Sequence, residues 1–206
     1  MAVVVADAGP LIALARVDAL DLLRELFRRI LVPEAVRAEC CAKPGPDADR
    51  ITAAIARKWL VVTPVTLPHA PAAQLGKGER QALALAQAHP SALLLVDDRL
   101  ARREAARLGL PFIGTVRVLW VAEQRGLIPS AERIVGQMRA NGYRISVDLL
   151  EVIRGGQRKA VALPRQENHS GESFINLFPL WYRIPCSHVL GSNRARLAGN
   201  AVALTR

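Results

Sequence analysis

Acidic residues stand directly after two apolar runs that have the composition of buried strands. Asp7 follows Val3–Ala6, and the pair Asp97-Asp98 follows Ala92–Val96. In an open parallel α/β sheet, ligands bind outside the carboxyl ends of the strands, where the strand order reverses. Acids gathered there can hold a divalent metal ion that activates water and orients a phosphate. An aspartate after a strand is also a common helix cap, so each of these residues is ambiguous when taken alone.

Two glutamates extend this acidic set. Glu79 shares a helical stripe with Leu83 and Ala86, and Glu39 lies three residues after Val36 on a similarly apolar side. A carboxylate on a buried stripe is unfavourable unless it is paired or bound to a metal. Two simpler interpretations stay open: Glu79 complements a helix dipole in a first turn, and Glu39 lies on an exposed helix edge.

The available ligand types indicate which ion such a site would take. Several carboxylates in one pocket repel each other unless a cation neutralises them. Oxygen ligands without histidine or cysteine favour hard ions, so the expected cofactor is Mg²⁺ or Mn²⁺. The four histidines and three cysteines have no metal-ligand spacing.

The charge balance favours a polyanionic partner. The chain has 28 Lys and Arg against 18 Asp and Glu, a net charge of +10, and neutralising phosphates releases their counterions. Basic residues flank the acids and are candidates for binding RNA phosphates: Lys77, Arg80, Arg99, Arg102 and Arg103. The alternative is that the arginines of the helix 99–108 only solvate its outer face.

Strand-like and helix-like segments alternate through most of the chain, which predicts an α/β fold. The predicted strands lie near 3–6, 30–32, 59–62, 92–96 and 111–113. The predicted helices begin at Pro10 and Pro33 or lie near 20–28, 79–89, 99–108, 130–141 and 146–154. Another helix is predicted between the turn at 43–46 and Trp59, and one more follows Thr115, which is a candidate cap. Such alternation gives a central parallel sheet with helices on both faces, a three-layer α/β/α fold. With the strand order 3-2-1-4-5, strands one and four are neighbours and their acids converge.

The composition divides the chain into two parts. Residues 1–154 are predicted to form one domain, and residues 155–206 a basic, poorly ordered extension in which helical periodicity stops. No apolar stretch reaches the length of a membrane span, and the start has no basic leader, so a cytoplasmic location is expected.

Four motifs in this order resemble the PIN domain of VapC-like toxin ribonucleases. They occupy residues 4–14, 76–82, 93–99 and 108–115, and the similarity is to an uncharacterised prokaryotic branch with GxGE and LLLxDD motifs. Together they are specific, and they span about residues 2–154.

The resemblance implies a role for each acid. The catalytic acids fall on Asp7, Glu39, Glu79 and Asp98, and the metal ligands on Asp7, Glu79, Asp97 and Asp98. It implies a Mg²⁺- or Mn²⁺-dependent endoribonuclease that acts as the toxin of a toxin–antitoxin pair. It further implies a small antitoxin protein as partner and assembly into dimers.

One departure from the family pattern leaves a second function open. The family usually has Ser or Thr soon after the first Asp, whereas this chain has Ala8 and Gly9. A PIN-type module that binds nucleic acid without cutting it is therefore the alternative. A phospho-acceptor receiver domain fits poorly, because Asp7 stands alone and Gly114-Thr115 replaces the expected lysine.

Overall fold

The short apolar segments pair into one parallel sheet. A computed structural model of the protein describes residues 3–66 and 74–143. The strands are β1 (Val4–Ala6), β2 (Ile30–Pro33), β3 (Leu60–Thr63), β4 (Leu93–Leu95) and β5 (Phe112–Ile113). Every neighbouring pair runs parallel, in the order β3-β2-β1-β4-β5. The predicted fold class and strand order are confirmed.

Eight helices lie between or after these strands in the described residues. They are α1 (Ala8–Arg16), α2 (Asp21–Phe27), α3 (Glu34–Cys40), α4 (Pro46–Ala56), α5 (Lys77–Gln87), α6 (Arg99–Arg107), α7 (Thr115–Gln124) and α8 (Ala131–Ala140). None of these helices is long and apolar enough to cross a membrane.

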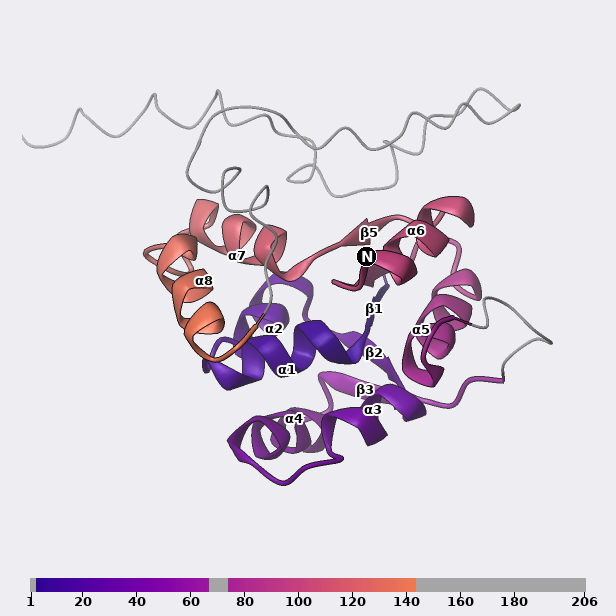
Figure 1. The fold of residues 1–206 in the computed structure, drawn as a ribbon, viewed down its shortest axis with the longest axis horizontal. Coiled ribbons are helices and arrows are strands. Elements are labelled where there is room, and N and C mark those ends of the chain that lie inside the picture. The colour runs from indigo at the N-terminus through magenta and orange to yellow at the C-terminus, as the bar shows by residue number, and fades with distance from the viewer. Residues whose placement is uncertain (1–2, 67–73, 144–206) are drawn as a thin grey trace, which may run out of the picture. The chain divides into compact units, whose positions relative to one another are not determined.

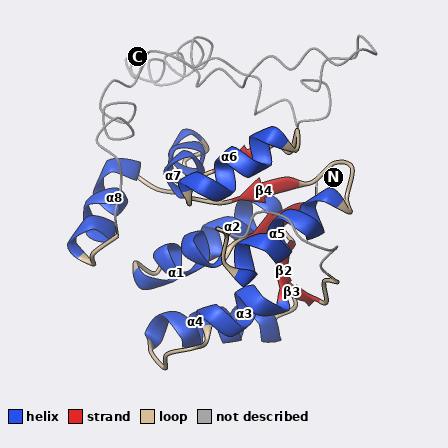
Figure 2. Ribbon diagram, turned by 45° about the vertical axis from the view of Figure 1, so that its right-hand side comes forward, coloured by secondary structure: helices blue, strands red, loops and turns tan. Residues whose placement is uncertain are grey.

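The helices cover both faces of the sheet. Helices α5 and α6 lie on one side of it, and α1, α2 and α7 lie on the other (Figures 1 and 2). On the first side, Val5 and Leu94 point from adjacent strands into a core that includes Ala82 of α5 and Ala105 of α6. Strands that are buried on both faces are continuously apolar, as the sequences of β1 and β4 are.

The register of β1 and β4 sets the position of the acids. Ala6 is opposite Leu95, and the Asp7 N–H donates a hydrogen bond to the Leu95 carbonyl at 3.0 Å. Asp7 and Asp97 therefore leave the sheet at the same edge from adjacent strands. This edge lies where the strand order reverses, as the sequence predicts.

Some element boundaries differ from the predicted ones. Helix α1 begins at Ala8, two residues before Pro10, because the N–H that proline lacks has no partner in a first helical turn anyway. Helix α5 begins at Lys77, two residues before the predicted start. The predicted helix 146–154 and the extension 155–206 lie outside the described residues.

Candidate active site at the strand ends

Asp7 is a buried acid whose side chain makes no capping hydrogen bond. It occupies the N-cap position of α1 and is 6% exposed. Burial raises the pKa of Asp7 to about 7, opposed by the Ala8 backbone N–H and reinforced by the negative charges of Glu79, Glu39 and Asp97. Such a carboxylate is unfavourably placed while it is charged and lacks a cation. It will therefore take up a proton or bind a positive ion.

The two glutamates come from helices that pack closely together. Glu79 lies in the first turn of α5, where its Oε2 accepts from the Gly76 N–H at 2.7 Å. Glu39 lies at the end of α3, and partial burial together with the charge of Glu79 raises its pKa. A Cβ on Gly78 would stand 3.0 Å from Glu39 Oε2 and 3.3 Å from a methyl carbon of Val36, so glycine permits this approach.

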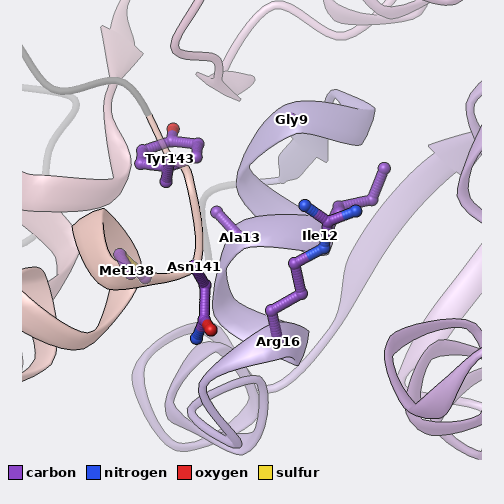
Figure 3. Close-up of a pocket in the computed structure, with 7 residues that line it drawn as sticks. All are labelled: Gly9, Ile12, Ala13, Arg16, Met138, Asn141 and Tyr143. Carbon is purple, nitrogen blue, oxygen red and sulfur yellow. The ribbon is translucent and has the colours of Figure 1, made fainter.

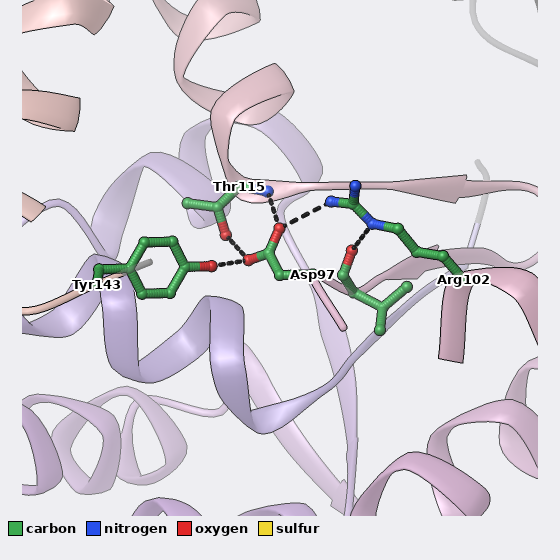
Figure 4. Close-up of polar contacts among 5 residues, drawn as sticks. Asp97, Arg102, Thr115 and Tyr143 are labelled. Carbon is green, nitrogen blue, oxygen red and sulfur yellow. Dashed lines mark hydrogen bonds and ion pairs between the residues drawn. The ribbon is translucent and has the colours of Figure 1, made fainter. Parts of the chain in front are cut away.

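Asp97 has four hydrogen-bond donors around its carboxylate (Figure 4). Its Oδ1 accepts from the Thr115 N–H at 2.9 Å and from Arg102 Nη2 at 3.0 Å. Its Oδ2 accepts from the Thr115 hydroxyl at 2.5 Å and from the Tyr143 hydroxyl. An ionised carboxylate offers about four lone-pair positions. The described contacts therefore satisfy Asp97 completely.

Arg102 and Thr115 make contacts with Asp97 that the sequence did not indicate, and the phosphate-binding role of Arg102 stays a prediction. Arg102, predicted to bind nucleic acid, is turned inward, with Nε donating to the Val96 carbonyl at 2.9 Å and Nη2 paired with Asp97. Thr115 does not cap α7, because its hydroxyl bonds to Asp97 and it forms the first residue of that helix. Both side chains donate hydrogen bonds to the carboxylate of Asp97.

Within the described residues, Asp98 caps helix α6 and makes no polar contact with Asp7, Glu39, Glu79 or Asp97. It is exposed and occupies the N-cap position of α6, where its Oδ1 accepts from the Ala101 N–H at 2.9 Å. Among the charges acting on Asp7, Asp97 contributes and Asp98 does not. The two neighbouring aspartates thus have different surroundings, and the catalytic role implied for Asp98 stays a prediction.

The other predicted phosphate-binding residues differ in accessibility. Lys77, Arg99 and Arg103 are exposed. Arg80 is half-buried, and within the described residues its buried Nε has no hydrogen-bond acceptor. The three exposed cations are thus available to a polyanion.

Sequence reasoning missed Tyr143 and Gly114. Tyr143 follows α8, and burial together with the nearby Asp97 charge raises its pKa. A Cβ on Gly114 would collide with Nη2 of Arg102 and stand 2.9 Å from Asp97 Oδ1. The sequence shows only that a glycine precedes Thr115. It does not show that a side chain at this position would collide with Arg102 and Asp97.

The donor chemistry of the site fits a hard divalent cation. Asp7, Glu39 and Glu79 supply only carboxylate oxygens, and the raised pKa values of Asp7 and Glu39 show charge that is not compensated. Over residues 3–66 and 74–143, no three acidic, histidine or cysteine side chains are gathered closely enough to hold one metal ion. The fold therefore brings the acids to one edge of the sheet but does not gather three of them around a single point in the described residues.

Comparison with known proteins identifies the family. No curated protein matches the chain. The sequence model of a family described as a PIN domain matches residues 3–156, which include all of β1–β5 and the five acids discussed above. PIN domains are nucleases in general. The chain therefore belongs to the PIN-domain family.

Proposed function

We propose that this protein is a metal-dependent endoribonuclease. The observation that carries the proposal is Asp7, a buried carboxylate without a capping bond, whose pKa is raised to about 7 by burial and by the negative charges of other acids. A structural acid is normally paired or hydrogen-bonded, as Asp97 is. Asp7, whose pKa is raised by burial in spite of the Ala8 backbone N–H, is placed at the reversal of strand order to bind a cation.

The acids divide the work of the proposed reaction. Asp7 and Glu79 would hold Mg²⁺ or Mn²⁺, with Glu39 close to Glu79. Asp98, which accepts one hydrogen bond through Oδ1, would complete the set, and Asp97 would do so only by exchanging one of its four donors for the ion. When bound, such an ion lowers the pKa of a water molecule and neutralises charge that develops on the phosphate. Glu39 is the acid best suited to accept a proton, because its pKa is raised while its side chain remains exposed.

RNA is the proposed substrate because exposed cations flank the acids. Lys77 is adjacent to Glu79 along α5, and Arg99 and Arg103 extend from the start of α6 beside Asp98. Phosphate contacts of this kind position a strand without reading its bases. The net charge of +10 supports the same class of partner.

The resemblance to VapC-like toxins supports a biological setting for this activity. We propose that the protein is the toxin of a toxin–antitoxin pair and that a small protein encoded beside it is its inhibitor. We also propose that the protein forms homodimers.

A second function is favoured by the surroundings of Asp97. Its four donors leave no acceptor position open, and no three acids of the described residues converge. A PIN-type module that binds nucleic acid without cutting it would have these properties. Such a module would bind RNA in a salt-sensitive manner without metal.

A cleavage assay distinguishes the two functions. The full chain is incubated with labelled single-stranded RNA and Mn²⁺, with and without EDTA, beside Asp7→Asn, Asp97→Asn and Asp98→Asn. We expect Mn²⁺-dependent cleavage that falls at least about 100-fold in Asp7→Asn, the loss typical for removing a group that stabilises the transition state. The other two variants show which aspartate of the pair contributes. Equal cleavage by the wild type and Asp7→Asn would exclude the proposed role of this site.

A further inference from the structure

A small pocket opens between α1 and the chain that follows α8. Its volume is about 160 Å³. One wall is a single stripe of α1 that has helical spacing, and the other is formed by the segment from Met138 to Tyr143 (Figure 3). The lining residues are Gly9, Ile12, Ala13, Arg16, Met138, Asn141 and Tyr143. The two small residues of the α1 stripe, Gly9 and Ala13, leave the space that forms the pocket.

The pocket adjoins both acids of the candidate site. At one end, a Cβ on Gly9 would lie 4.0 Å from Asp7 Oδ2. At the same time, the Tyr143 ring lines the pocket while its hydroxyl donates to Asp97. A molecule in this pocket would therefore lie beside the carboxylates that are proposed to act on a phosphate.

A second hollow continues the first one away from the acids. It has a volume of about 280 Å³ and shares Arg16 and Asn141 with the first pocket. Its other lining residues are Pro46, Asp47 and Arg50, at the start of α4. The two hollows together form a path that begins at Gly9, the neighbour of Asp7 in α1, and leads along α1 toward α4, as a groove for a chain-like ligand would.

The lining chemistry suits a flat ring with a polar edge. Ile12, Ala13 and Met138 provide apolar contact, and the Tyr143 ring adds an aromatic surface. The exposed Asn141 amide offers both a donor and an acceptor. This combination of apolar surface and amide hydrogen bonding is how proteins bind unstacked nucleobases.

Arg16 adds a cation to the polar end of the pocket. Its Nε donates to Asp47 Oδ2 at 3.0 Å, and its side chain is 54% exposed. A guanidinium has five N–H donors, so a bond through Nε leaves donors that can reach a phosphate or a base edge.

We propose that this pocket binds one base of single-stranded RNA, next to the phosphate that lies at Asp7. The inference rests on the proposed ribonuclease function, and it identifies a base of the RNA as the part of the substrate that the enzyme recognises. It also gives a reason for the glycine at position 9, because Gly9 lines the pocket beside Asp7. A larger side chain at this position would project into the end of the pocket nearest Asp7.

Binding measurements on full-length protein test this inference without requiring cleavage. Asp7→Asn is used as the parent, and fluorescence anisotropy follows its binding to four short single-stranded RNAs, each with one type of base. Asn141→Ala should weaken binding of the preferred RNA about five- to tenfold, the effect of losing one hydrogen bond, and should reduce the difference between bases. Ile12→Trp, which fills the pocket, should weaken all four RNAs.

The matched control is Gln137→Ala. Gln137 is another exposed amide, one helical turn before Asn141, and it does not line the pocket. We expect its affinities to stay within about twofold of the parent. Asn141 is exposed, so its replacement keeps the test valid even where Ile12→Trp disturbs folding.

Three results would overturn the inference. The first is that the parent does not bind RNA, and the second is that Asn141→Ala and Ile12→Trp bind RNA as tightly as the parent does. The third is that free nucleoside monophosphates compete fully with RNA while neither variant changes the affinity for RNA. Failure of the proposed function has a different signature. In that case wild-type protein does not cleave RNA with Mn²⁺, while the base-dependent binding and its sensitivity to Asn141→Ala persist.

Discussion

The ends of β1 and β4 carry aspartates that share an edge of the sheet but have opposite surroundings. Asp7 is buried and makes no capping bond, and the negative charges of Glu79, Glu39 and Asp97 help to raise its pKa. Asp97 accepts four hydrogen bonds, one of them from the arginine that neutralises it. Burial without partners raises the energy of a charge, whereas burial with donors stabilises it. The difference indicates that Asp97 holds the edge of the site together and that Asp7 is left to bind a cation.

The largest expected consequence of this contrast is a pH-dependent stability at Asp7. The pKa of Asp7 is raised in the folded protein to about 7, so the folded state keeps a proton that the unfolded state has already lost above about pH 4. Stability from this group is complete below the unfolded pKa and is lost as the pH rises through 7, by roughly 1.4 kcal/mol per pH unit. Asp7→Asn, which has no charge to bury, should therefore become the more stable protein as the pH rises.

Urea denaturation at pH 5, 6, 7 and 8 without divalent metal measures this difference. The free energy of unfolding of Asp7→Asn minus that of the wild type should increase with pH, up to about 4 kcal/mol. Asp98→Asn is the matched control, because asparagine also caps a helix, and it should differ from the wild type by less than about 0.5 kcal/mol at pH 8. A difference for Asp7→Asn that stays constant with pH would contradict the contrast.

Asp97→Ala should have the opposite effect on stability. It leaves Arg102, Thr115 and Tyr143 without their common acceptor, and the lost bonds include an ion pair whose side chains are 27% and 20% exposed. Because water partly reaches this ion pair, we expect the free energy of unfolding to fall by about 3 kcal/mol, which is near the low end for breaking a buried ion pair. Chemical denaturation at pH 7 measures it, and a variant as stable as the wild type would show that Asp97 does not organise this edge.

Gly114→Ala should reproduce part of that loss. The added Cβ would collide with Arg102 and displace it from Asp97, lowering stability by about 1–2 kcal/mol. Gly136→Ala is the matched control, because a Cβ there meets no atom within 4 Å and the residue lies inside α8. It should instead raise stability by about 0.5–1 kcal/mol, as glycine is unfavourable within a helix. A thermal melt of both variants suffices, and equal changes in the two would refute the steric account.

The sequence predicted the sheet and Asp7 better than it predicted the contacts of Asp97. Strand order and the position of Asp7 and Asp97 after adjacent strands follow from local patterns, namely apolar runs that alternate with helical stripes and end in aspartate. Thr115 and Tyr143 reach Asp97 from 18 and 46 residues away. Such contacts depend on how α7 and α8 pack, and no local pattern encodes them.

Arg102 and Asp98 show the same limit at short range. Both follow Asp97 within a few residues, and composition alone suggests that an arginine here contacts a phosphate and that an aspartate binds metal. The turn at Val96–Asp98 instead directs Arg102 inward and makes Asp98 a helix cap. Side-chain direction after a strand depends on backbone angles that residue types do not determine.

A titration of the Asp7 carboxyl group by NMR tests the central claim most directly. The full chain is labelled with ¹³C at aspartate carboxyl carbons, and Asp7→Asn assigns the Asp7 resonance. We predict a pKa near 7 without divalent ions and a clearly lower one with Mg²⁺, because only the ionised carboxylate binds the cation. A pKa near 4 that does not change with Mg²⁺ would contradict the claim that Asp7 is an uncompensated acid placed to bind a metal ion.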